Sequence, residues 1–347
     1  MTDERLTAVA PCHETYELRG RDVHPTRLCD GEARAVRPRQ VAPRPPPLRS
    51  VLVPVDGTSA AEHALPYAVA LARRAGAEVM LAHVYSTLLA ANDPERLGWR
   101  GGEYLVAPLR DYLDALAARV AGVCPVPVRP VLLRGYWPED VLCEWGDREA
   151  DLVVMAARRR GWWSRLWSGG VSTEVARQSR PPVLLVPAPT GPPDLSAEPP
   201  VGRVLVPLDG TARAERALGP AAALAALVGG GCELLNVVRT RPYAVDWSLA
   251  HGGPPSRPTA ERTREANRYL RGVADRLRAR SVPARWRAVT GDRPVADAIA
   301  RYAELSGTDL IALASRGGVG WRGLFRESLA VQVSRRAPVP VLICRAS

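Results

Sequence analysis

The sequence predicts an α/β fold made of two tandem, doubly wound domains, each with a five-stranded parallel sheet. A long segment occurs twice, because VLVPVDGTSAAEHALPYAVALA from Val51 returns as VLVPLDGTARAERALGPAAALA from Val204. Within each copy, short apolar runs alternate with longer amphipathic segments, as strands and helices do in α/β domains. Runs such as DLVVMA and PVLLV are apolar on both faces, which indicates strands covered by helices on each side.

Each copy is a whole domain rather than one unit of a solenoid. Asp56 and Asp209 hold the same place in the repeat, 153 positions apart, and the closing runs RPPVLLVPA and APVPVLICRA also agree. The Pro-rich run APTGPPDLSAEPPVG between the copies predicts a linker. We therefore expect a disordered arm over 1–49, domains over 50–188 and 203–347, and a linker over 189–202.

The apolar and amphipathic periods place the elements in the same order in both copies. In the first copy we expect strands near 50–55, 78–85, 126–133, 151–157 and 182–187, and helices near 59–75, 102–121, 137–149 and 170–180. In the second copy we expect strands near 203–208, 232–239, 284–290, 308–314 and 339–344, and helices near 212–228, 259–280, 293–306 and 327–336.

Composition limits the class of protein. With 46% apolar residues in a chain of 347, two full cores can be buried. No apolar run reaches the ~18 residues of a membrane helix, and the N-terminal run has acids but no apolar stretch typical of a secretory signal. The six cysteines show no repeated spacing, which favours reduced thiols over a disulfide framework. A cytoplasmic protein without membrane contact is expected.

The net charge of +11 raises nucleic acid as a partner. This interpretation is disfavoured, because the arginines alternate with acidic residues through most of the chain. The run ARAVRPRQVAPRPPPLR from Ala33 to Arg49 is purely basic, and its prolines predict an extended, solvated arm. An inert tether is favoured there over a weak electrostatic contact with an anionic partner.

Five segments resemble universal stress protein domains. They are the opening VLVPVDGT or VLVPLDGT, the segment LAHVY, the GD-x-P turn from Gly291 to Pro294, the ADL or TDL strand and the closing PVLLV. The resemblance covers nearly all of the chain from Ser50 to Cys344. It implies the adenine nucleotide α-hydrolase-like fold and an intramolecular pseudo-dimer, with the terminal strands Val183 to Val186 and Val341 to Ile343 at the junction.

Asp56 and Asp209 follow the first strand of each copy, where a doubly wound sheet opens a ligand crevice. An Asp followed by Gly-Thr can instead close a turn or cap the next helix, and both interpretations stay open. Carried over by position, the contacts of the family are Pro54, Asp56 and Val84 in the first copy and Pro207, Asp209 and Val237 in the second.

The ATP-binding members of the family carry the pattern G-x2-G-x9-G-S/T after the fourth strand, and its glycines let backbone N–H groups approach the phosphates. The first copy departs from it, because Ala156 and Arg159 replace two glycines, Gly169 is kept and Gly170 replaces the hydroxyl residue. Since the Arg159 side chain fills space that glycine leaves free, this copy is not expected to hold ATP as the family does.

The second copy keeps more of the pattern. Ala314 and Glu327 replace the first and third glycines, while Gly317 and Ser328 remain. A carboxylate at the start of a helix repels phosphates at close range. We therefore expect ATP to bind weakly at most in the second copy.

Other motifs favour simpler explanations. Gly318, Gly320 and Gly323 spell G-x-G-x-x-G, but only about one strand follows and no suitable acidic residue comes 20 positions later. The run RRRGWWSRLW from Arg158 aligns with the loop of the degenerate site, so tryptophans at a domain junction are favoured over base stacking or membrane contact. Potential metal ligands in the arm, namely Cys12, His13, His24 and Cys29, have no zinc spacing, and His63 and His83 are isolated.

We interpret the chain as a non-catalytic stress-response protein whose pseudo-dimer binds a ligand or a protein partner. The alternative is an ATP-binding member that uses the second copy, with slow hydrolysis at most. The third interpretation is nucleic-acid binding through the arginine-rich surface, which would show steep salt dependence. No metal is expected.

Overall fold

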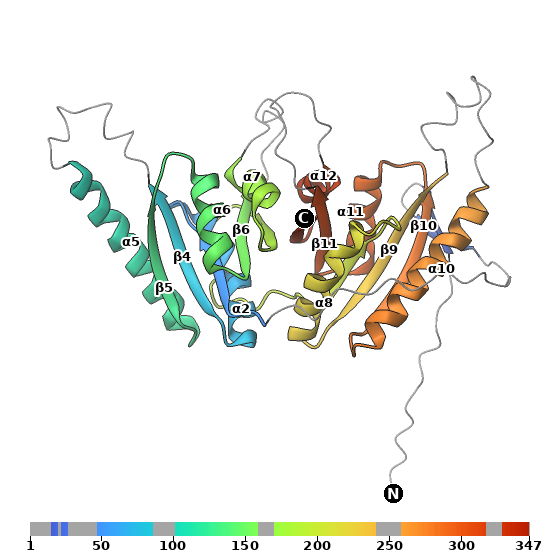
Figure 1. The fold of residues 1–347 in the computed structure, drawn as a ribbon, viewed down its shortest axis with the longest axis horizontal. Helices are drawn as coiled ribbons and strands as arrows, with labels where there is room; N and C mark the ends of the chain where they lie inside the picture. The colour runs from blue at the N-terminus through green and yellow to red at the C-terminus, as the bar shows by residue number, and fades with distance from the viewer. Residues whose placement is uncertain are drawn as a thin grey trace, which may run out of the picture.

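A computed structural model describes residues 15–19, 22–26, 47–85, 101–158, 170–240, 258–316 and 328–346. Two copies of one α/β unit lie side by side (Figure 1), and their ten strands form a single 12-stranded sheet together with two strands of the N-terminal arm. The strand order is β2-β1-β10-β9-β8-β11-β12-β7-β6-β3-β4-β5. Among the described residues, no helix combines the length and the apolar character that a bilayer span requires.

The first copy is a parallel sheet in the order β7-β6-β3-β4-β5. Its strands are β3 (Ser50–Pro54), β4 (Glu78–Tyr85), β5 (Val128–Arg134), β6 (Leu152–Arg158) and β7 (Val183–Ala188), and its helices are α1 (Ser59–Glu62), α2 (Leu65–Ala75), α5 (Gly101–Val123), α6 (Pro138–Glu149) and α7 (Val171–Gln178). The single helix expected over 59–75 is two helices. The second restarts with Pro66 in its first turn, where a missing backbone N–H costs nothing.

The second copy repeats this arrangement in the order β10-β9-β8-β11-β12. Its strands are β8 (Arg203–Pro207), β9 (Gly231–Arg239), β10 (Ala284–Gly291), β11 (Leu310–Arg316) and β12 (Val341–Ala346), and its helices are the 3-10 helix η2 (Ala214–Ala217), α8 (Leu218–Leu227), α10 (Thr259–Arg278), α11 (Val295–Ser306) and α12 (Leu329–Arg336). The outer bounds of the expected elements differ from the observed ones by no more than two residues.

The two copies meet through their last strands. β7 and β12 run antiparallel, with Leu184 opposite Leu342 and Val183 opposite Ile343. All four side chains are buried. The terminal strands that the resemblance implied for the junction therefore lie side by side, joined by backbone pairing as well as side-chain packing.

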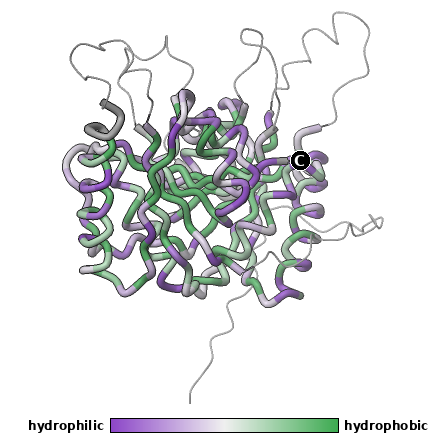
Figure 2. The backbone as a smooth tube through the Cα atoms, turned by 60° about the vertical axis from the view of Figure 1, so that its left-hand side comes forward, coloured by the Kyte–Doolittle hydropathy of each residue, from purple (hydrophilic) through white to green (hydrophobic). Residues whose placement is uncertain are grey.

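Two hydrophobic cores cover the two faces of the sheet, and each core extends through both copies. Helices α2, α5, α8 and α10 pack over one face, around residues such as Val51 and Val204. Helices α6, α7, α11 and α12 pack over the other, around Leu52 and Leu205. The hydropathy colouring in Figure 2 shows the apolar strands enclosed between the helices. Since neighbouring strand residues point to opposite faces, strands that are apolar at every position supply both cores.

The N-terminal arm differs in part from the disordered segment expected over 1–49. β1 (Thr15–Arg19) and β2 (Asp22–Thr26) pair as an antiparallel hairpin, and β1 runs parallel to β10, with Tyr16 opposite Val289. The expectation is therefore wrong for these two segments. Without β1, β10 would be an edge strand whose outer backbone N–H and C=O groups had no partners in the sheet. An extended segment such as β1 supplies those partners. Residues 27–46, including most of the Pro-rich run, lie outside the described residues.

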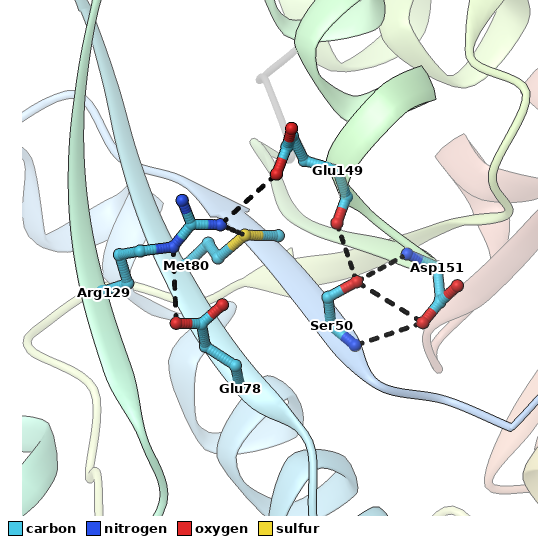
Figure 3. A network of polar contacts seen from close by, with 6 residues as sticks. All are labelled: Ser50, Glu78, Met80, Arg129, Glu149 and Asp151. Carbon is cyan, nitrogen blue, oxygen red and sulfur yellow. Dashed lines mark hydrogen bonds and ion pairs between the residues drawn. The ribbon is translucent and has the colours of Figure 1, made fainter.

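Polar contacts hold the amino ends of the first copy's strands together (Figure 3). The Asp151 carboxylate accepts a hydrogen bond from the Ser50 N–H at 3.2 Å, and the Ser50 hydroxyl donates to the Glu149 carbonyl at 2.8 Å. Arg129 of β5 lies 3.3 Å from a Glu78 oxygen and 3.6 Å from a Glu149 oxygen. These contacts join β3, β4, β5 and β6 at the end opposite the expected crevice.

Candidate functional site

The candidate site of each copy lies at the carboxyl end of its first strand. In the first copy β3 lies between β4 and β6, and in the second β8 lies between β9 and β11. The strand order therefore reverses at β3 and β8, which is where doubly wound sheets bind ligands. Asp56 and Asp209 come two residues after these strands end. The topology thus places the two predicted Asp residues at equivalent positions, beside the point where the strand order reverses.

Both Asp residues close a tight turn. Oδ1 of Asp56 accepts hydrogen bonds from the Thr58 N–H at 3.0 Å and the Thr58 hydroxyl at 2.5 Å. Oδ1 of Asp209 accepts the same pair from Thr211, at 3.0 and 2.6 Å. The glycine between them has φ of +81° in the first copy and +84° in the second, a conformation that glycine adopts without strain. The turn-closing role is therefore present, and ligand contact by these residues stays a prediction.

The second strand of each copy carries a polar residue beside this turn. In the second copy, Asn236 of β9 donates through Nδ2 to the Leu208 carbonyl at 2.7 Å. His83 of β4 holds the same place in the first copy, and its ring packs edge-on against Tyr112, with centroids 6.3 Å apart. Burial is the main cause that lowers the pKa of His83, and the negative charge of Asp56 opposes the shift. Nδ1 of His83 is buried and has no hydrogen-bond partner among the described residues.

A carboxylate follows the turn in both copies, buried at Glu62 and partly buried at Glu215, and sequence reasoning missed it. The Glu62 carboxylate accepts from the Tyr112 hydroxyl at 3.2 Å and from Arg119 at 3.1 Å. These two residues lie seven apart on α5, so they share one face of the helix. The cluster links α5 to α1, the short helix that follows the Asp56 turn.

The second copy has the same cluster. Glu215 of η2 accepts from the Tyr269 hydroxyl at 2.9 Å and from Arg276 at 2.8 Å. Burial is the main cause that raises the pKa of Tyr112 and of Tyr269, and the charge of the neighbouring Glu adds to it. Both tyrosines therefore stay protonated and donate. The repeat does carry a signal for this cluster. Each copy has a Glu six residues after its Asp and a Tyr-x6-Arg pattern in its second amphipathic segment.

The remaining predicted residues fall into three groups. Pro54, Val84 and Ala156 lie near the carboxyl ends of β3, β4 and β6, and Pro207, Val237 and Ala314 lie near those of β8, β9 and β11. Gly170 precedes α7 as its N-cap, and Ser328 caps α12 by accepting a hydrogen bond from the Val331 N–H at 3.4 Å. Arg159, Gly169, Gly317 and Glu327 lie outside the described residues.

The minor motifs add no further chemistry to the described part of the chain. Nε2 of the half-buried His63 lies 3.0 Å from the Gly191 carbonyl oxygen of the linker. No group of three metal-binding side chains occurs among the described residues. Residues 318–323, residues 159–167, and Cys12, His13 and Cys29 lie outside them, while His24 is in β2.

Comparison with known proteins identifies the fold and the family. The model of the universal stress protein family matches residues 47–187 and 200–345. A universal stress protein of Thermus aquaticus is 29% identical over 139 residues, which are 40% of this chain and 98% of that protein.

Two solved structures share the tandem fold. The crystal structure of a universal stress protein from Archaeoglobus fulgidus is 18% identical, with a TM-score of 0.63, and covers 86% of this chain and 96% of its own. A protein of unknown function from Pseudomonas aeruginosa is 14% identical, with a TM-score of 0.51, and covers 86% of this chain and 92% of its own. Because the family match extends over both copies, the chain belongs to the universal stress protein family.

Proposed function

We propose that this chain is a non-catalytic, cytoplasmic regulator whose two crevices no longer bind ATP as the family's ATP-binding members do. The observation that carries the proposal is the same in both copies. Ala156 and Ala314 replace the first glycine of the phosphate-binding pattern, and each lies inside a strand, in register with Val186 and Cys344. A position in the sheet with a side chain leaves less room for a phosphate than a glycine does.

The Asp turns support a binding role rather than a catalytic one. One oxygen of each carboxylate already accepts two hydrogen bonds from a Thr of the same turn. That oxygen is therefore already engaged within the turn, and the carboxylate acts there as a structural group. We therefore expect neither copy to turn over ATP. A regulatory role then depends on a ligand or protein partner recognised by the paired domains.

The second candidate function is ATP binding by the second copy. Ser328 favours it, because this residue begins α12 and the N-terminus of a helix attracts anions. Its hydroxyl, however, already caps the helix by accepting from the Val331 N–H. The sequence also places Glu327 directly before Ser328. Two like charges about 4 Å apart repel by roughly 4 kcal/mol at an effective dielectric constant near 20.

Calorimetric titration with ATP, with and without magnesium, tests the proposal. We expect wild-type protein to bind ATP weakly or not at all. The double variant Ala314→Gly, Glu327→Gly should bind at least tenfold more tightly. The matched variant Ala156→Gly, Arg159→Gly should gain less, because Gly170 offers no hydroxyl. Micromolar binding by the wild type that Asp209→Ala abolishes would overturn the proposal, as would nucleotide found by mass spectrometry in gently purified protein.

A further inference from the structure

The two copies share a fold but differ in net charge. Residues 203–347 contain 23 arginines and 12 acidic residues, whereas residues 50–188 contain 15 of each. The net charge of the chain, +11, is therefore matched by the excess in the second copy alone. A compositional preference for arginine would act on both copies, so the asymmetry calls for a local cause.

The difference is sharpest on the outer faces of two equivalent helices. Helices α5 and α10 flank opposite ends of the sheet (Figure 1). The outer face of α10 carries Arg264, Arg268 and Arg271, all exposed and spaced four and three residues apart. This spacing aligns them along one side of the helix over about 10 Å. Within the described residues, none of the three takes part in a hydrogen bond or an ion pair.

The same positions of α5 carry the opposite charge. When Tyr112 is aligned with Tyr269, and Arg119 with Arg276, the three arginines of α10 correspond to Ala107, Asp111 and Asp114. These three residues are exposed as well. Two arginines of one copy thus face solvent where the other copy has aspartates. The buried Glu–Tyr–Arg cluster, by contrast, is kept in both.

The flanking residues limit what the stripe can bind. Glu261 precedes it, the exposed Glu265 lies between Arg264 and Arg268 in the sequence, and Asp275 follows it but is paired with Arg278 at 3.2 Å. The apolar face of α10, with Leu270, Val273 and Leu277, is buried in the core. No large hydrophobic side chain is exposed on α10. A membrane-surface helix needs an apolar face to insert, and the centre of a protein interface is enriched in aromatic residues.

We propose that the arginine stripe of α10, formed by Arg264, Arg268 and Arg271, binds the phosphate backbone of nucleic acid without sequence preference. Arginine forks bind phosphate oxygens in pairs, and unpaired guanidinium groups lose no protein contact when they do so. The stripe contacts phosphates alone, so it supplies affinity and salt dependence rather than base recognition. This inference is independent of any nucleotide bound in the crevices.

Fluorescence anisotropy with a labelled 20-base-pair duplex of arbitrary sequence tests the stripe in the full chain, at 50 to 200 mM NaCl. The wild type should bind with an affinity that falls steeply as salt increases. The triple variant R264Q/R268Q/R271Q should bind more weakly, and its slope of log K against log salt should be smaller by about 2.7, or roughly 0.9 for each lost phosphate contact. Unchanged circular dichroism would show that the variant is folded.

Two matched variants separate the stripe from net charge. The variant R110Q/R134Q/R148Q loses the same charge from the first copy and should change the slope by less than one contact, or about 0.9. The variant A107R/D111R/D114R places three arginines at the equivalent positions of α5 and should bind the duplex more tightly than the wild type. Absent duplex binding at 50 mM NaCl, or equal losses in the two glutamine triples, would overturn the proposal. Binding to heparin or anionic vesicles without binding to the duplex would overturn it too.

Discussion

The carboxylates of Glu62 and Glu215 give a stability test with an internal comparison. Replacing Glu215 by Ala removes the acceptor of both Tyr269 and Arg276. The side chains of Glu215 and Arg276 are only 13% and 20% exposed, so the arginine would be left as an uncompensated, largely buried charge. Removing one partner of a buried pair costs about 3–5 kcal/mol. Nε of Arg276 already has no partner among the described residues, so the remaining N–H groups have few alternatives.

The same substitution at Glu62 should cost less. Arg119 is 51% exposed, so water takes over much of its solvation when the carboxylate is lost. An exposed ion pair contributes about 0–1 kcal/mol, and the unsatisfied Tyr112 hydroxyl adds about 1–3 kcal/mol. We therefore expect Glu215→Ala to lower the free energy of unfolding by about 3–4 kcal/mol and Glu62→Ala by about 2 kcal/mol.

Urea unfolding followed by circular dichroism measures both losses, because the midpoint shifts while the slope stays constant if compactness is unchanged. Tyr112→Phe and Tyr269→Phe serve as controls, since each removes one hydroxyl and keeps the ring. They should cost about 1 kcal/mol each and differ little from one another. Equal losses for the two Glu variants, or a larger loss at Glu62, would refute the argument that exposure of the arginine decides the cost.

Two further predictions concern pH and the junction. Burial lowers the pKa of His83 in the folded protein, so folding favours the neutral side chain. This contribution to stability is complete above the pKa of the unfolded chain, near 6.5, and is lost as the pH falls toward the lower pKa of the folded protein. His83→Asn, which copies the second domain, should therefore reduce the drop in urea midpoint between pH 7 and pH 5, and an unchanged drop would contradict this. Separate chains of residues 50–190 and 200–347 should each fold but associate through exposed Leu184 and Leu342 in analytical ultracentrifugation. If both halves stay monomeric and do not bind each other, the idea that the junction stabilises the pair is refuted.

Much of the fold follows from local pattern. The observed β4 has the bounds expected from its apolar run, 78–85, because a short apolar run between turn residues is itself the signal of a buried strand. The Asp-Gly-Thr turns were also predictable, since Asp, Gly and Thr act through bonds to their own neighbours. The N-terminal hairpin was not, because β1 depends on the unpaired edge of a strand more than 250 residues away.

By itself the sequence determined that two α/β copies exist, where their strands and helices lie, and that both copies depart from the family's phosphate-binding pattern. These properties depend on residues close together in the chain or on comparison of the two copies. Only the tertiary structure decided that Glu62 meets Tyr112 and Arg119, that β7 and β12 run antiparallel, and that the side of α10 with the three arginines is exposed. Those contacts need helices and strands already packed on one sheet, because burial and long-range pairing arise from the position of each element in the whole fold and not from its own periodicity.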